Sequence, residues 1–218
     1  MQRSWYVPAA LVTAVAAALV GLPGGAFAAA AAPVNIIKNP GAEAGPGSPD
    51  GSKVAVPDWT VKKSNNFTAV QYGAPGGFPA KTDPGPKTRG ANFFAGGPAG
   101  THGTATQSDS LAPYKSIIAS GASFTLQGWL GGFGSQGDHA TLTVTWEDST
   151  GATLGTAVIG PVGAKARKDL TGLLHRELTG TVPAGSATAL VTIAMTRQAG
   201  AYNDGYADNL SLTIVAAG

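Results

Sequence analysis

The chain lacks cysteine altogether and has few charged residues, and each shortage excludes a class of protein. Without cysteine, the 218 residues can form no disulfide scaffold, no thiol nucleophile and no thiolate metal site. Charged residues make up 12% of the chain, against about 25% in ordinary globular domains, so a solvated, disordered chain is not expected. The 14 Lys and Arg residues nearly balance the 12 Asp and Glu residues and form no basic run, so no nucleic-acid partner is expected.

Glycine and proline are abundant, with 32 and 15 residues respectively. Both are unfavourable in helix interiors, which argues against a helical bundle. The length allows one domain with a sizeable hydrophobic core.

The N-terminus has the three-part order of a secretory signal peptide. Arg3 supplies positive charge, residues 7–22 are almost wholly apolar, and small residues precede a predicted cleavage after Ala28. A membrane-spanning helix needs about 20 apolar residues, more than this stretch offers. The sequence therefore predicts a signal peptide over residues 1–28 and a single mature domain over residues 29–218. It predicts a secreted, extracellular protein with no membrane attachment after cleavage.

Short runs of alternating apolar and polar residues, separated by turn-forming residues, indicate β-strands in the mature chain. The clearest run is 140–146, in which Ala, Leu, Val and Trp alternate with threonine. The turn at residues 148–151 then leads into the run 152–159, which predicts a hairpin. Further strands are predicted at residues 34–38, 59–61, 67–72, 91–95, 123–130, 189–197 and 206–214. About eight such strands predict an all-β fold of two antiparallel sheets packed face to face.

Three short motifs lie near the two ends of the mature chain: NPGAE at residues 39–43, VPDW at 56–59 and YADNLSL at 206–212. Together they resemble the galactose-binding-like jelly rolls, a superfamily that includes many secreted carbohydrate-binding modules. This resemblance implies a jelly-roll-like antiparallel β-sandwich without catalytic activity. It also implies a structural calcium ion between the first and last strands, with Glu43 and Asp208 as side-chain ligands.

Strand phase gives a separate reason to single out Asp208. The alternation predicts that Asp208 shares one face of its strand with Tyr206 and Leu210, and a carboxylate in register with core residues is costly to bury unless it is paired or metal-bound. Calcium needs about 6–8 oxygen ligands, which carboxylates and loop carbonyls supply. The alternative leaves Asp208 in solvent at the strand start, or bonded to backbone amides.

Two regions supply candidate ligand-binding residues. Trp129 falls in the polar phase of its predicted strand, where it is either a platform for a ligand or packed under a loop. The loop that follows contains Gln136 and Asp138. A second loop, near the C-terminus, combines groups that can hydrogen-bond and stack a sugar, namely Arg197, Tyr202, Asn203, Asp204 and Tyr206. The alternative is that this second loop is simply a turn whose tyrosine caps the core.

Few residues are available for catalysis. Glycoside hydrolysis commonly uses two carboxylates separated by about 5–10 Å, and only Asp204 and Asp208 have a spacing that suits such a pair. The three histidines lie far apart in the sequence, and no Gly-x-Ser-x-Gly motif occurs. We therefore expect no enzyme activity.

These observations predict a secreted, non-catalytic module that binds a carbohydrate or a cell-envelope glycan. Two alternatives stay open. One is a structural or adhesive extracellular protein without a small ligand, and the other is a glycan-active hydrolase or lyase on the same scaffold. The oligomeric state and the identity of the ligand do not follow from the sequence.

Overall fold

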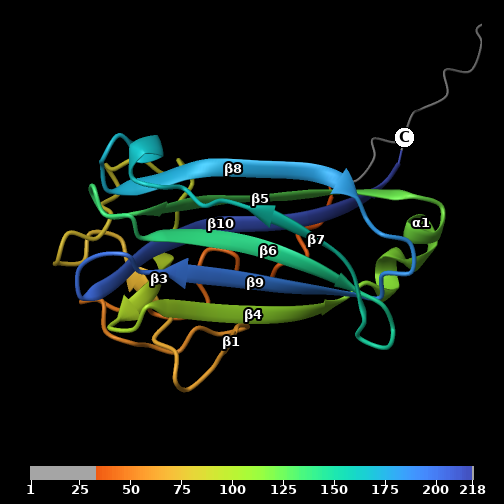
Figure 1. The fold of residues 1–218 in the computed structure, drawn as a ribbon, viewed down its shortest axis with the longest axis horizontal. Helices are drawn as coiled ribbons and strands as arrows, with labels where there is room; N and C mark the ends of the chain where they lie inside the picture. The colour runs from red at the N-terminus through yellow and green to blue at the C-terminus, as the bar shows by residue number, and fades with distance from the viewer. Residues whose placement is uncertain (1–32, 218) are drawn as a thin grey trace, which may run out of the picture. The chain divides into compact units, whose positions relative to one another are not determined.

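The computed structural model describes residues 33–217, and the predicted signal peptide lies outside this range. These residues form two five-stranded antiparallel sheets packed face to face (Figure 1). The predicted fold class, an all-β, jelly-roll-like sandwich, is confirmed. Among the described residues, no helix has both the length and the apolar composition needed to cross a membrane.

The first sheet runs in the order β1-β4-β9-β6-β7. Its strands are β1 (Thr60–Val61), β4 (His102–Ser110), β9 (Thr188–Thr196), β6 (His139–Glu147) and β7 (Thr153–Ile159). The hairpin predicted from the sequence is that of β6 and β7. The carboxylate of Asp148 accepts the backbone N–H of Thr150 and that of Ala152, which closes the turn between them.

The second sheet runs in the order β2-β3-β10-β5-β8. Its strands are β2 (Thr68–Gln71), β3 (Asn92–Pro98), β10 (Tyr202–Ala216), β5 (Ala122–Gly132) and β8 (Gly172–Thr181). The short helical segments are η1 (Ala112–Tyr114) and α1 (Lys115–Ala119), which follow β4, and η2 (Lys165–Arg167), which precedes β8.

Residues 34–38 do not form the predicted strand. The segment still contacts the second sheet, because Ile36 N–H donates to the Leu212 carbonyl at 2.8 Å. Asn35 adds two further hydrogen bonds to β10, to the Leu210 carbonyl and from the Leu212 N–H.

The main core lies between the two sheets, where alternate residues of each strand meet. In β6 the buried residues are Ala140, Leu142, Val144 and Trp146, as the alternation predicts. The half-buried threonines between them face outwards from the first sheet.

Part of the second sheet is apolar on both faces, which is unusual for a solvent-facing antiparallel sheet. A second cluster lies on the side away from the main core, and we call it the outer aromatic layer. Its buried members are Val70, Phe93, Ala95, Leu173 and Tyr206, and its partly buried members include Tyr72, Phe78, Trp129, Phe133 and Tyr202. The loop of residues 73–89 lies over this layer, because Phe78 contacts the rings of Phe93 and Tyr206 and the Pro84 carbonyl accepts the Leu173 N–H.

A β-bulge in β10 reverses the phase predicted for Asp208. The register with β5 shifts between Asp208 and Ser211, and Asn209 has a φ of 46°, in the left-handed region. Leu210 therefore packs in the main core, while Asp208 pairs in register with Trp129 on the outer face. The predicted common face of Tyr206, Asp208 and Leu210 is wrong, because the bulge adds a residue to the alternation.

Candidate functional site

Trp129 lies on the outer face of β5, with one residue of an adjacent strand on each side of it. Asp208 of β10 and His175 of β8 are its register partners. The Trp129 and His175 rings are 5.6 Å apart between centroids, and His175 Nε2 lies 3.2 Å from Gln127 Oε1 on the same face. Trp129 is half-buried and His175 is exposed, so the Trp129 indole faces solvent with polar side chains beside it.

Asp138 has a structural position rather than a ligand-facing one. It is fully buried, and its carboxylate accepts three backbone N–H groups, those of Gln198, Ala199 and Asp204, at 2.7–2.9 Å. A carboxylate bonded in this way holds the second candidate loop against the first. Asp138 is therefore not available to a sugar in this arrangement.

Asn203 and Arg197 also bond to the backbone. The buried Asn203 side chain donates to the Met195 carbonyl and accepts the Gly205 N–H. Arg197 donates to the Ala201 carbonyl at 2.7 Å. Both residues shape the second loop, and neither is among the residues that line the cavity described next.

Three of the predicted binding residues do meet, in a cavity of about 300 Å³ that we call the loop cleft. They are Gln136, Tyr202 and Asp204. The cleft is completed by Asp50, Phe78, Phe133 and small residues of the loops around Pro75 and Gly200. Tyr206 lies beneath it, fully buried, and donates its hydroxyl to Asp204 Oδ1 at 2.5 Å.

Burial raises the pKa of Asp204 to about 6; the nearby Asp138 contributes to this shift and the Tyr206 hydroxyl opposes it. Burial also raises the pKa of Tyr202, with Asp204 and Asp50 adding to the effect. At neutral pH the cleft therefore combines ionised carboxylates with protonated phenols.

Glu43 and Asp208, the predicted calcium ligands, already have hydrogen-bond donors. Asp208 is fully buried and accepts the Tyr72 hydroxyl and the Asn209 N–H, each at 2.7 Å. Glu43 accepts the backbone N–H groups of Ala91 and Asn92. These hydrogen bonds use carboxylate oxygens that a calcium ion, which takes about 6–8 oxygen ligands, would compete for. Within residues 33–217, no three acidic or histidine side chains gather as a metal site. Calcium binding by the chain stays a prediction.

Arg167 was not a candidate, yet it supports the loop that carries two of the cleft residues. It is buried, and its guanidinium donates to the carbonyls of Phe133, Gly134 and Gln136 as well as to those of Val162 and Leu170. In the sequence it is one of several nearby basic residues that look like an exposed cluster. No local signal distinguishes it, because its partners in the Phe133 loop lie more than 30 residues away.

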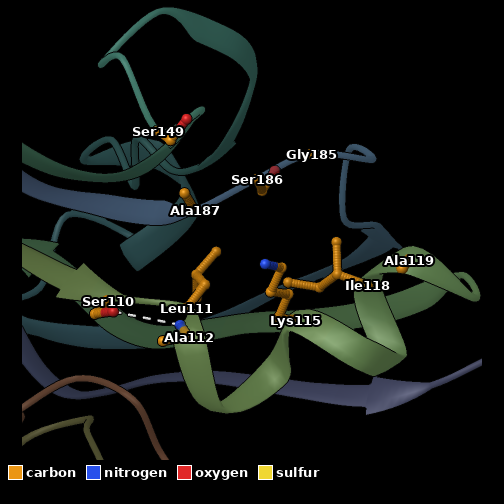
Figure 2. Close-up of a pocket in the computed structure, with 10 residues that line it drawn as sticks. All are labelled: Ser110, Leu111, Ala112, Lys115, Ile118, Ala119, Ser149, Gly185, Ser186 and Ala187. Carbon is orange, nitrogen blue, oxygen red and sulfur yellow. Dashed lines mark hydrogen bonds between the residues drawn. The ribbon is translucent and has the colours of Figure 1, made fainter.

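Another cavity, of about 430 Å³, lies beside α1 (Figure 2). Its lining includes apolar Leu111 and Ile118, three serines and Lys115, the one charged residue. No aromatic ring lines it, which makes it a poorer platform for a sugar than the outer aromatic layer.

No protein-family model and no curated protein matches the chain. Several solved structures are similar in fold. The Family 16 Carbohydrate Binding Module-2 is 18% identical with a TM-score of 0.50, and the match covers 82% of this chain and 99% of that one. The Stig cyclase Fisc from Fischerella sp. TAU, solved with an indole derivative, is 15% identical with a TM-score of 0.55, covering 86% and 100%.

The enzymatically active domain of bacteriophage CBA120 tailspike protein 4 is 14% identical with a TM-score of 0.49, and the match covers 83% of this chain. The match covers only 21% of the length of that protein chain. At such identities the likeness concerns the fold alone. The chain has a β-sandwich fold of the kind found in carbohydrate-binding modules.

Proposed function

We propose that this protein binds a carbohydrate or a cell-envelope glycan without chemical change, and that Trp129 is its principal contact. The observation that carries the proposal is the position of Trp129 on the solvent side of the second sheet. An aromatic ring offers an apolar face to the C–H groups of a sugar, and its neighbours can bind the hydroxyls.

The polar neighbours of Trp129 support the same function. Gln127 and His175 offer hydrogen-bond donors and acceptors beside the indole, and Glu177 of β8 pairs in register with Gln127. These side chains are held on strands, so their spacing is set by the sheet. A ligand site of this kind combines an apolar platform with a few directed polar groups.

The similarity in fold to a carbohydrate-binding module supports this function by analogy. The predicted signal peptide supports the part of the proposal that places this function outside the cell.

A glycan array, probed with the purified protein in the presence of calcium and then of a chelator, tests the proposal. We expect wild-type protein to bind a defined set of neutral glycans and Trp129→Ala to lose that binding. Thr156→Ala, an exposed residue of β7 in the other sheet, is the matched control and should bind normally. Equal binding by wild-type and Trp129→Ala proteins, or no binding by folded wild-type protein, would contradict the proposal.

A further inference from the structure

Three oxygen acceptors of the loop cleft have no hydrogen-bond donor among residues 33–217. Asp204 is only 9% exposed, and its carboxylate accepts a single hydrogen bond, at Oδ1 from Tyr206, which leaves Oδ2 free. Gln136 Oε1 is buried without a partner. Asp50 uses one oxygen for Ser48 and Ser52, and its Oδ2 accepts nothing. Asp50 is exposed, whereas the Gln136 oxygen is buried and Asp204 is nearly so, and acceptors left without a donor at such positions favour a ligand that brings donors.

No lysine, arginine or histidine lines the loop cleft. The two ion pairs of the described residues join Lys38 to Asp109 and Lys165 to Asp169, so neither cleft carboxylate is paired. Arg167 lies behind the Phe133 loop, where backbone carbonyls engage its guanidinium. The carboxylates of Asp50 and Asp204 therefore face the cleft without a balancing cation.

The walls of the cleft are aromatic. The Phe78 and Tyr202 rings meet edge to face at 5.0 Å between centroids, and Phe133 lies on the cleft lining with them. Ring faces attract cations and also pack against the C–H groups of a sugar. The volume of about 300 Å³ is at the lower end for ligand sites, which suits one sugar ring better than a chain.

We propose that the loop cleft is a subsite for a protonated amino sugar, whose ammonium group binds the carboxylates of Asp50 and Asp204 while its ring packs against Phe78 and Tyr202. An ammonium group has three donors and no acceptor, which suits the two carboxylates of the cleft. The inference rests on the proposed glycan-binding function for the sugar and adds a charge requirement that the Trp129 face does not have.

The charged and titratable groups around Asp204 agree with this ligand. Asp138 of the first loop and Tyr202 and Tyr206 of β10 surround it, and none of them is a cation. Asp204 is mostly ionised above about pH 6, so a cationic ligand is attracted most strongly above that pH while its own amine is still protonated.

Isothermal titration calorimetry with three matched probes tests the inference at low salt and about pH 6.5, where Asp204 is mostly ionised and a sugar amine, with a pKa no higher than that of an α-amino group, is still largely protonated. The probes are the tetramer of β-1,4-linked glucosamine, its fully N-acetylated counterpart, and cyclohexylammonium as an amine without a sugar. We expect the glucosamine tetramer to bind at least about tenfold more tightly than either other probe, as one added charge-assisted hydrogen bond implies.

Two neutralising variants locate the site. Asp50→Asn, at an exposed position, and Asp204→Asn should each weaken glucosamine binding about tenfold or more, since each removes one charged acceptor. Asp58→Asn, at an exposed aspartate outside the cleft, is the matched control and should bind as wild type. If Asp204→Asn does not fold, Asp50→Asn alone decides the matter.

Equal affinity for the glucosamine and N-acetylated tetramers would overturn the inference, and so would unchanged glucosamine binding by Asp50→Asn. Tighter binding of cyclohexylammonium than of the sugar would indicate a general amine site and would also overturn it. Failure of the proposed Trp129 function gives a different result from failure of this inference. If Trp129 is not the glycan contact, Trp129→Ala leaves binding of neutral glycans unchanged, and this result does not depend on the cleft variants.

Discussion

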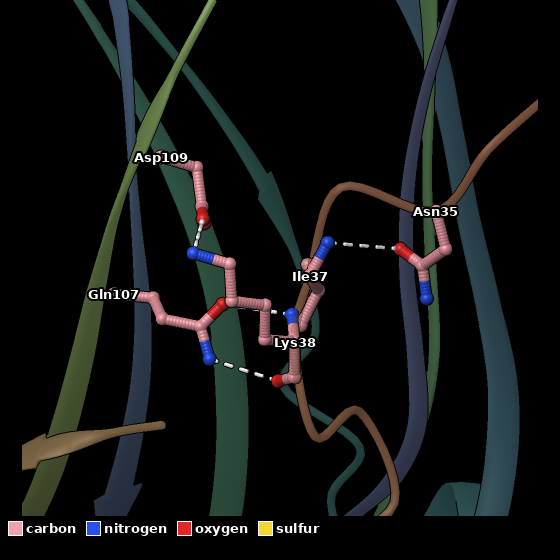
Figure 3. Close-up of polar contacts among 5 residues, drawn as sticks. All are labelled: Asn35, Ile37, Lys38, Gln107 and Asp109. Carbon is pink, nitrogen blue, oxygen red and sulfur yellow. Dashed lines mark hydrogen bonds and ion pairs between the residues drawn. The ribbon is translucent and has the colours of Figure 1, made fainter.

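The side-chain amide of Gln107 pairs with the backbone of Lys38 through two hydrogen bonds, as a neighbouring strand would (Figure 3). Lys38 N–H donates to Gln107 Oε1 at 2.9 Å, and Gln107 Nε2 donates to the Lys38 carbonyl at 2.8 Å. Ile36, two residues earlier, is bonded to the other sheet through Leu212. The N-terminal segment therefore joins the two sheets, although it forms no strand of its own.

We predict that Gln107→Ala lowers the free energy of unfolding by about 1–3 kcal/mol, because it removes the buried amide that bonds both the N–H and the carbonyl of Lys38. Urea unfolding followed by circular dichroism measures the change. Ser108→Ala, at the next and exposed position of β4, serves as the control and should change little. An equal effect of the two substitutions would show that the Gln107 bonds contribute nothing specific.

Asp138→Ala should lower the free energy of unfolding by about 2–4 kcal/mol, because three backbone N–H groups lose their acceptor at a fully buried site. Asp148→Ala is a matched control, since Asp148 also accepts three hydrogen bonds but in the β6–β7 turn, where water can replace them. Thermal unfolding of both variants should show the larger loss for Asp138. Loss of the same size at both positions would contradict the role of burial.

Stability should decline as the pH rises from about 4 to 7. Burial raises the pKa of Asp208 to about 7, and the neighbouring Glu43 adds to the shift, while the donors Tyr72 and Asn209 oppose it. Over this window the native state holds a proton that the unfolded state has released, so the free energy of unfolding falls as Asp208 ionises. Asp208→Asn should flatten part of this decline and raise the Tm near pH 8.

Thermal melts at about pH 5 and pH 8, with calcium and with chelator, check this prediction against the calcium site expected from the sequence. A bound cation keeps Asp208 ionised, so calcium binding there would remove the decline and make the Tm of wild-type protein depend on calcium. That result would contradict the hydrogen-bonded state of Asp208. Asp58→Asn, at an exposed site, should follow the wild-type profile.

Trp129→Ala should change the free energy of unfolding by no more than about 1 kcal/mol, because the indole lies outside the main core and half in solvent. Trp146→Ala is the matched comparison and should cost about 3–5 kcal/mol, because Trp146 is buried between the sheets. Denaturant unfolding of the two variants measures the difference. A loss at Trp129 as large as that at Trp146 would identify it as a structural residue and weaken the glycan-binding proposal.

The two-sheet architecture follows from the sequence because strand alternation is local. Ala140 to Trp146 alternate with threonines, and this run became β6 with its apolar face in the core. The β6–β7 turn could also be predicted from the sequence, since the Asp148 carboxylate accepts hydrogen bonds from residues only two and four positions ahead. The sequence also singled out Tyr202, Asp204 and Gln136, which the fold brings to one cleft.

Tertiary structure alone decided where the charged groups lie. Asp138 bonds N–H groups 60 residues away, and Asp208 bonds a tyrosine 136 residues away, so their satisfaction depends on partners that no local pattern contains. The bulge at Asn209 moved Asp208 from the predicted core face to the outer aromatic layer. Alternation is a property of neighbouring residues and can be read along the chain. The burial and pairing of a carboxylate depend on which distant segments the fold packs against it.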